Sequence, residues 1–329
     1  MSPVYNSILD LIGNTPVIRI NKLNPNEKVT VYAKLEKFNP GGSVKDRIAI
    51  KMIEQAEHDG LLTKEKVVIE PSSGNTGIGL ALVCTQKGYP LEIIMPETMS
   101  MERRRILLAY GAKIILSKGS RGMTGAEDLC NELIKANPEK YFRPNQFANK
   151  NNISAHYETT GKEIIEDTDG RITMFVAGLG TTGTIMGVSK RLKEYNPQIE
   201  IIGVEPYDPL SQIQGLKNLD TDYIPQIYDP SLIDEKVKVK DDEAMEMARR
   251  LTIQEGIFSG ISSGAAMHVA IEKAKTLNSG VIVVLLPDGG EKYCTTALYD
   301  PKACLECVKK CQVITAITDE YIKSMDPFL

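Results

Sequence analysis

The sequence lacks tryptophan and has only three histidines among its 329 residues. It also lacks any apolar stretch near the ~20 residues that a membrane-spanning helix needs, and any long basic run of the kind that binds a nucleic-acid backbone. Its N-terminus shows no charged segment followed by an apolar one, so no secretory signal is expected. These absences argue against a membrane, secreted or nucleic-acid-binding protein and predict a cytoplasmic one.

Cysteine is sparse as well, with six residues scattered along the chain, which argues against a disulfide scaffold. The histidines have no acidic partners at zinc-site spacing, so a metallohydrolase is not expected. What is present is average for a globular protein: 42% hydrophobic residues, 25% charged residues and a net charge of −4. At about 150 residues per domain, this length predicts two domains.

Short β-rich runs alternate with segments of helical periodicity along the chain. The strand candidates are nearly continuous Val/Ile/Leu runs, as expected for strands covered on both faces: 29–35, 66–70, 91–95, 113–116, 173–177, 199–204 and 280–286. Helices are predicted over 43–58, 101–110 and 242–255. The alternation predicts an α/β fold in which helices flank two open, twisted, mainly parallel sheets.

Five turns that follow these strands are rich in glycine and hydroxyl side chains: 39–45, 71–77, 178–184, 260–264 and 287–290. Glycine lets a ligand approach the backbone closely, and a helix N-terminus presents free N–H groups to an anion. Ligands of open α/β sheets bind at the carboxyl ends of the strands. The turns therefore predict an anion-binding cleft between two domains.

The turn Gly178-x-Gly180-x-x-Gly183 matches a dinucleotide fingerprint, and Glu205 ends the next strand at the spacing of a ribose-binding acid. An NAD-dependent oxidoreductase is therefore one interpretation. However, the turn lies in the middle of the chain, and Thr181 and Thr182 supply hydroxyls suited to a monophosphate. Nothing else in the chain indicates a hydride-transfer site, so a phosphate cup is favoured.

Lys45 follows Pro40-Gly-Gly-Ser43, in which Ser43 is the expected N-cap of a helix. The positive end of the helix dipole disfavours a protonated amine in the first turn, which helps a lysine act as a nucleophile. A reactive lysine and a phosphate cup are the two groups needed to hold pyridoxal phosphate.

The chain resembles the fold type II pyridoxal-phosphate enzymes, and most closely the cysteine synthases, from Leu9 to Tyr293. The resemblance is carried by long motifs: Asn39-Pro-Gly-Gly-Ser-Val-Lys-Asp-Arg47, Glu70-Pro-Ser-Ser-Gly-Asn-Thr-Gly77, Met95-Pro-Glu-Thr-Met-Ser-Met-Glu-Arg-Arg104 and Glu255-Gly-Ile-Phe-Ser-Gly-Ile-Ser-Ser-Gly-Ala265. It implies a smaller mobile substrate-binding domain of residues 45–150. Residues 1–44 and 151–300 would form the larger domain that binds the cofactor phosphate, and 301–329 a C-terminal extension.

The resemblance also implies roles for individual residues. Lys45 would be the Schiff-base lysine and later the acid–base at the substrate α-carbon. The substrate carboxylate would be gripped by Gln146 and by one loop, made of Ser72, Ser73, Gly74, Asn75 and Thr76. Asn75 would also bond the pyridoxal 3′-oxygen. The phosphate cup would be Gly180, Thr181, Thr182, Gly183 and Thr184, with Thr182 where many relatives have glycine, a change the cup is expected to accept.

The partner of the pyridine nitrogen has two candidates, Ser262 and Asp288. An uncharged hydroxyl leaves that nitrogen unprotonated and favours β-elimination, whereas an aspartate would protonate it. Ser262 is therefore expected to make the contact, with Asp288 nearby. His156 and Tyr157, before Thr159-Thr160-Gly161, resemble a family segment and are expected to pack, or to support site residues from behind, rather than to catalyse.

The resemblance implies a homodimer that forms L-cysteine by β-replacement from an O-activated serine and a sulfide donor. Alternatives are cystathionine formation in the same family or, outside it, a catalytically inactive scaffold that binds a partner. Several segments are similar to the B-type branch that uses O-phosphoserine, and Lys217 stands where that branch has arginine. A lysine there favours a phosphate dianion, so Lys217 is expected to contact the donor phosphate.

Cys304, Cys307 and Cys311 form a cluster beyond the last family motif. The spacing is compatible with three ligands to zinc or to an iron–sulfur cluster, with a redox-active Cys-x-x-Cys pair, or with unrelated free thiols. The active site itself is expected to need no metal.

Overall fold

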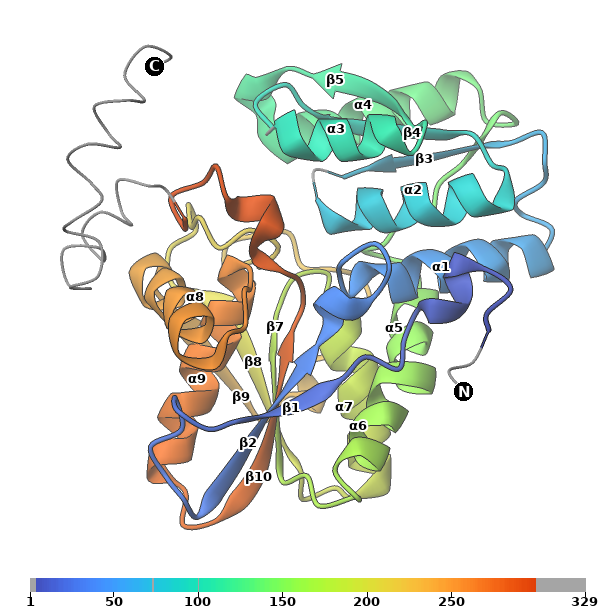
Figure 1. Ribbon diagram of the computed structural model, residues 1–329. Coiled ribbons are helices and arrows are strands. Elements are labelled where there is room, and N and C mark those ends of the chain that lie inside the picture. The colour runs from blue at the N-terminus through green and yellow to red at the C-terminus, as the bar shows by residue number, and fades with distance from the viewer. Residues whose placement is uncertain (1–3, 73, 100, 300–329) are drawn as a thin grey trace.

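A computed structural model describes residues 4–72, 74–99 and 101–299, which fold around two sheets (Figure 1). The larger sheet has the strand order β1 (Val17–Ile20), β2 (Val29–Leu35), β10 (Gly280–Leu286), β7 (Met174–Gly178), β8 (Glu200–Pro206) and β9 (Glu235–Val239). The smaller sheet has the order β5 (Lys113–Ser117), β4 (Leu91–Pro96), β3 (Val67–Pro71) and β6 (Tyr141–Phe142). Every pairing is parallel except that of β1 with β2. The predicted α/β class is confirmed.

Helices cover both faces of each sheet. The α-helices are α1 (Lys45–His58), α2 (Asn75–Lys87), α3 (Met101–Ala109), α4 (Gly122–Ala136), α5 (Asn151–Ala155), α6 (Gly161–Asp167), α7 (Gly183–Tyr195), α8 (Asp241–Glu255) and α9 (Ile261–Thr276). A π-helical segment, η4 (His156–Thr160), joins α5 to α6. The short 3-10 helices are η1 (Ile8–Leu11), η2 (Glu36–Phe38), η3 (Gly119–Arg121), η5 (Pro230–Leu232) and η6 (Gly290–Tyr293).

The central strand β10 is apolar along its whole length because its alternate side chains enter different cores. In β10, Ile282 and Val284 pack with α8 and α9, whereas Val283 and Leu285 pack with α7 on the opposite face. The smaller sheet packs against α1, α2 and α3 on one face and against α4 on the other. None of the helices in the described part of the chain is long and apolar enough to cross a membrane.

The elements differ from the sequence-based expectation in several places. The strands β1 and β6 were not expected: β1 is a short antiparallel edge, and β6 has two residues. The helix predicted from Ser43 begins at Lys45 instead, with Val44 as its N-cap residue. Ser43 stays outside because its backbone forms a bridge with Asp288, although its hydroxyl still accepts a hydrogen bond from the Lys45 backbone N–H at 3.2 Å.

Candidate active site

A cavity that is partly open to solvent lies where several strands end and helices begin. Its lining residues come from the glycine-rich turns and from one loop after β8: Val44, Lys45, Asn75, Ala177, Gly178, Gly180, Thr181, Thr182, Thr184, Gln214, Gly215, Leu216, Ser262, Leu285 and Pro287. Residues far apart in the chain thus meet at the carboxyl ends of the strands, the usual ligand position in α/β sheets.

Lys45 is the first residue of α1 and lines this cavity. Burial lowers the pKa of its amine to about 8, although the negative charges of Asp288 and Glu36 act in the opposite direction. The neutral amine, which is the form that acts as a nucleophile or a base, is therefore more populated near neutral pH than it is for an ordinary lysine, although the protonated form still predominates at pH 7.

The cup residues fit an anion such as a phosphate. Gly180, Thr181, Thr182 and Thr184 line the cavity, and Gly183 begins α7, so the helix N-terminus faces it. The buried Thr182 hydroxyl has no hydrogen-bond partner in the described structure. A Cβ at Gly180 would lie 2.2 Å from the Gly215 carbonyl oxygen, so the cup requires glycine at this position.

Thr182 has a left-handed backbone, with a φ of +68°. Glycine adopts this conformation freely, but it is disfavoured for a β-branched residue. The threonine at this position is therefore held with backbone strain, and its acceptance by a phosphate cup stays a prediction. Strain of this kind is typical of ligand-binding sites.

Asn75, at the start of α2, lines the cavity and is held by two neighbours, the buried Asp288 and the half-buried Lys292. Its amide donates to Asp288 Oδ2 at 2.7 Å, and its Oδ1 accepts from Lys292 Nζ at 2.8 Å. Burial lowers the pKa of Lys292. Sequence reasoning did not identify Lys292; its position just after the 287–290 turn was the available signal.

The two candidates for the pyridine nitrogen lie in different places. Ser262, in the first turn of α9, lines the cavity. Asp288 is buried beside it, where its Oδ2 accepts from Asn75 and from the Tyr293 hydroxyl at 2.7 Å each. The contact of Ser262 with the ring nitrogen remains a prediction.

Among the described residues of the expected substrate loop, Asn75 lines the cavity and Ser72, Gly74 and Thr76 do not. Thr76 donates its hydroxyl to Gln146 Oε1 at 2.6 Å, so these two residues meet. The Ser72 hydroxyl accepts from the backbone N–H groups of Gly74 at 3.4 Å and Gly77 at 3.1 Å. Ser73 lies outside the described residues.

Buried Glu70 at the end of β3 holds the backbone of the Gln146 turn. Its carboxylate accepts from the N–H groups of Asn145 at 3.0 Å and Gln146 at 3.2 Å. Burial raises the pKa of Glu70 to about 7. Sequence reasoning placed Glu70 in a motif without giving it this structural role.

Lys217 follows Leu216 but does not line the cavity. Its ammonium lies 5.5 Å from the centre of the Phe147 ring, a cation–π distance, and its backbone N–H donates to the Leu179 carbonyl at 2.8 Å. The described geometry thus places Lys217 next to the turn that carries Gln146.

Glu205 does not reach the cavity and cannot serve as a ribose-binding acid there. It is buried on β8, where it accepts from the Leu219 N–H at 3.1 Å and pairs with Lys236 at 3.4 Å. This geometry argues against the dinucleotide interpretation. Among the described residues no cluster could hold a metal ion, and Cys304, Cys307 and Cys311 lie outside them.

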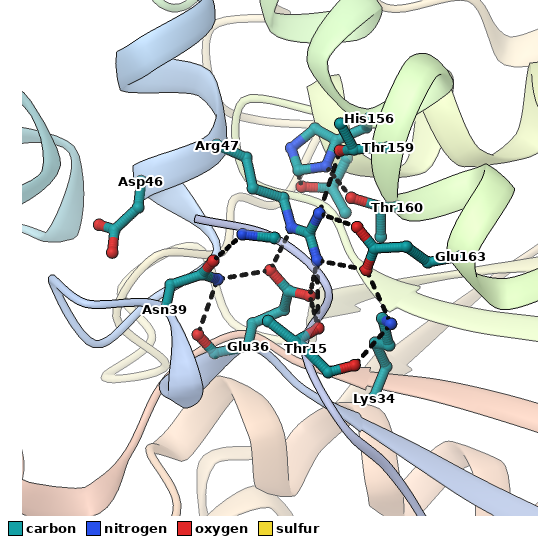
Figure 2. A network of polar contacts seen from close by, with 12 residues as sticks. Thr15, Lys34, Glu36, Asn39, Asp46, Arg47, His156, Thr159, Thr160 and Glu163 are labelled. Carbon is teal, nitrogen blue, oxygen red and sulfur yellow. Dashed lines mark hydrogen bonds and ion pairs between the residues drawn. The ribbon is translucent and has the colours of Figure 1, made fainter. Parts of the chain in front are cut away.

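Arg47 anchors the helix that carries Lys45 (Figure 2). Its guanidinium is buried and binds Glu36 from η2 and Glu163 from α6, with N–O distances of 2.6 to 2.9 Å.

Further residues support these ion pairs. Thr15 and Thr159 accept hydrogen bonds from the Arg47 guanidinium at 3.1 and 3.0 Å. Lys34 supports Glu163 from β2 at 2.8 Å. Sequence reasoning did not predict this network, which joins four segments of the chain.

Comparison with known proteins agrees with this geometry. The family described as pyridoxal-phosphate dependent enzyme matches residues 8–288. A cysteine synthase of Aquifex aeolicus is 48% identical over 303 residues, covering 90% of this chain and 93% of that protein. Cysteine synthase B of Pseudomonas aeruginosa is 43% identical over 302 residues, covering 92% and 100%.

Solved structures show the same similarity. The crystal structure of cysteine synthase from Entamoeba histolytica has a TM-score of 0.87 at 40% identity, covering 91% of this chain and 93% of that one. A hydrogen sulfide-producing enzyme of Fusobacterium nucleatum has a TM-score of 0.84 at 46% identity, covering 88% and 100%. The chain therefore belongs to the cysteine synthase family of pyridoxal-phosphate-dependent enzymes.

Proposed function

We propose that this protein forms L-cysteine by replacing the leaving group of an O-activated L-serine with sulfide, and that the reaction takes place in the cavity at Lys45. The observation that carries the proposal is the combination, in one cavity, of a lysine whose pKa is lowered to about 8 and a threonine-lined anion cup. When bound, pyridoxal phosphate supplies an electron sink for the α-carbon of the amino acid.

The residues around the cavity have distinct tasks in this proposal. Thr181, Thr182 and Thr184 hold the cofactor phosphate with the N-terminus of α7. Lys45 holds the cofactor and, once neutral, takes the proton from the substrate α-carbon. Ser262 bonds the pyridine nitrogen without charging it.

The substrate carboxylate is oriented by Asn75 and by the loop around it. Ser72, Thr76 and Gln146 supply further polar groups next to the cavity. Because these three residues do not line the cavity, we propose that the smaller domain, residues 45–150, closes and carries them inward, while Arg47 keeps the start of α1 at Lys45 in place. All strands of the smaller sheet lie within this segment. Closure would exclude water from the reacting atoms.

The proposed function is tested by measuring cysteine formation from O-acetylserine and O-phosphoserine with sulfide. We expect turnover in the native protein and its loss in Lys45→Ala. Lys51→Ala is the matched control, because Lys51 lies on the same helix but pairs with Glu158 near the surface at 2.7 Å. Turnover that survives in Lys45→Ala would contradict the proposal. Homocysteine as the second substrate tests cystathionine formation.

We further propose that the chain belongs to the branch that uses O-phosphoserine, with Lys217 as the contact for the donor phosphate. In Lys217→Ala, kcat/KM should fall for phosphoserine and stay nearly constant for acetylserine. Lys240→Ala is the control, since Lys240 lies 6.0 Å from the Tyr207 ring and outside the cavity lining. Equal losses for both donors would remove this role from Lys217.

We also propose that the protein is a homodimer, as the family resemblance implies. Its N-terminal segment exposes apolar side chains that a second subunit could cover, including Val4 and Tyr5, which are 95% and 52% exposed. Sedimentation at micromolar concentration should show twice the chain mass; a monomer would contradict the proposal.

A further inference from the structure

The hydroxyl groups of two threonines in the cup each contact a buried side-chain nitrogen on the side away from the cavity. Asn152 Nδ2 donates to the Thr181 hydroxyl oxygen at 3.1 Å, and His156 Nε2 lies 3.1 Å from the Thr184 hydroxyl oxygen. Both side chains have no exposed surface, and neither lines the cavity. Neither residue can therefore touch a ligand of the cup directly, and each reaches it only through residues of the cup.

The orientation of the Asn152 amide is determined by its other partner. Nδ2 also donates to the backbone carbonyl of Gln146 at 2.8 Å, and a carbonyl can only accept. The nitrogen must therefore face both Gln146 and Thr181. The oxygen of the same amide fills the space beside Gly183, where a Cβ would lie 1.8 Å from it, so the amide is held in place by packing.

His156 is held equally closely. It begins the π-helical segment η4, and its Cβ packs against Gly187 of α7, where an added Cβ would lie 2.7 Å from it. Its Nδ1 lies 2.9 Å from the Thr160 hydroxyl oxygen (Figure 2). Burial, together with the charges of Arg47 and Lys45, lowers the pKa of His156 well below its usual value, so the ring is neutral. One ring nitrogen then donates and the other accepts.

The ligand of the cup decides between the two tautomers. A hydroxyl has one hydrogen, and a phosphate offers only acceptor oxygens. If Nε2 accepted the Thr184 hydrogen, the hydroxyl would present lone pairs to the phosphate. If Nε2 carries the hydrogen, it donates to Thr184, whose own hydrogen is free to point into the cavity. Thr160 then donates to Nδ1.

We propose that Asn152 and His156 are positioning residues that direct the hydroxyl hydrogens of Thr181 and Thr184 toward the cofactor phosphate, each by donating a buried N–H to the hydroxyl oxygen. The inference rests on the proposed function, in that the cup must bind that phosphate. Charge-assisted hydrogen bonds to the phosphate follow from this arrangement, and these are stronger than neutral ones.

The first test is the tautomer of His156 in the cofactor-loaded protein. Long-range ¹H–¹⁵N spectra are tractable because the chain has only three histidines, and His156→Gln identifies the signal. We expect the proton on Nε2 and an unprotonated Nδ1. A proton on Nδ1 alone, or on both nitrogens, would overturn the assignment for His156.

The second test compares the affinity of the cofactor-free protein for pyridoxal phosphate and for pyridoxal. In His156→Leu and Asn152→Leu, affinity for the phosphate ester should fall about 10- to 100-fold, the range of a hydrogen bond to a charged group. Affinity for pyridoxal should stay within about twofold. His156→Gln, which keeps an N–H donor, should recover much of the loss, and His58→Leu on the exposed end of α1 should change neither affinity.

The outcomes separate the inference from the proposed function. Equal losses for both ligands, or no recovery in His156→Gln, would mean that these residues only support the fold, and the inference would be wrong. Native protein that binds pyridoxal as tightly as its phosphate ester would contradict the phosphate cup itself, and with it the proposed function.

Discussion

Replacing Arg47 should destabilise the protein strongly, because the guanidinium neutralises two carboxylates in the interior. Its side chain is 1% exposed, and those of Glu36 and Glu163 are 0% and 11% exposed. In Arg47→Met, Glu36 would keep only neutral donors, the Thr15 hydroxyl and the Asn39 amide. Removing one partner of a buried ion pair costs about 3–5 kcal/mol.

The surroundings of Glu163 decide where the loss of stability in Arg47→Met falls within the range of about 3–5 kcal/mol. Burial raises the pKa of Glu163, but the hydrogen bond and charge of Arg47, and then Lys34, lower it to about 2. A folded-state pKa below the unfolded one contributes stability that is present above about pH 4 and lost as the pH falls toward 2. At pH 7 the contribution is complete. Because Lys34 still neutralises Glu163 in the variant, we expect a loss of about 3 kcal/mol.

The assay is urea unfolding at pH 7, followed by circular dichroism, with saturating cofactor for all variants. Lys51→Met on the same helix is the control and should cost less than about 1 kcal/mol, as surface ion pairs do. Arg47→Lys keeps the positive charge but not the paired N–H donors of the guanidinium, and it should lose less unfolding free energy than Arg47→Met. The double variant Arg47→Met/Glu36→Gln should recover part of the loss. The reasoning would be refuted if Arg47→Met lost no more unfolding free energy than Lys51→Met. It would also be refuted if the loss in Arg47→Met/Glu36→Gln equalled the sum of the losses in the two single variants.

Two further predictions concern the cavity. In cofactor-free protein, acylation of the Lys45 amine can be followed by mass spectrometry. The acylation rate should rise with pH around a midpoint near 8, because burial lowers the pKa of this amine. Asp288→Asn removes a negative charge that raises this pKa and should move the midpoint lower, whereas an upward shift would contradict this explanation of the pKa. Thr182→Gly should stabilise the cofactor-free protein in thermal unfolding by up to about 1 kcal/mol, because it relieves the left-handed strain at φ +68°. The same change should weaken cofactor binding through the loss of the hydroxyl, and an unchanged affinity would mean that Thr182 does not bind the phosphate.

The sequence predicted the features that depend on local chemistry. Glycine, proline and hydroxyl residues mark turns because they control backbone torsions and hydrogen bonds within a few residues. The sequence therefore predicted that Lys45 lies in the first turn of a helix, and the structure confirms this position. It also predicted the bounds of β2 and β10, which agree with the structure. Continuous apolar runs indicated strands that are buried on both faces, because this pattern too lies within a few neighbouring residues.

Features formed by residues distant in the chain were decided only by the tertiary structure. The hydrogen bond of Asn75 to Asp288 spans 213 positions and that of Arg47 to Glu163 spans 116, and no local pattern indicates which of many polar residues will meet. The edge strand β1 exists because β2 offers it hydrogen-bonding partners. Whether a buried charge or histidine is stable depends on the partners that surround it in three dimensions, so the support behind Lys45 and behind the threonine cup could not be read from sequence.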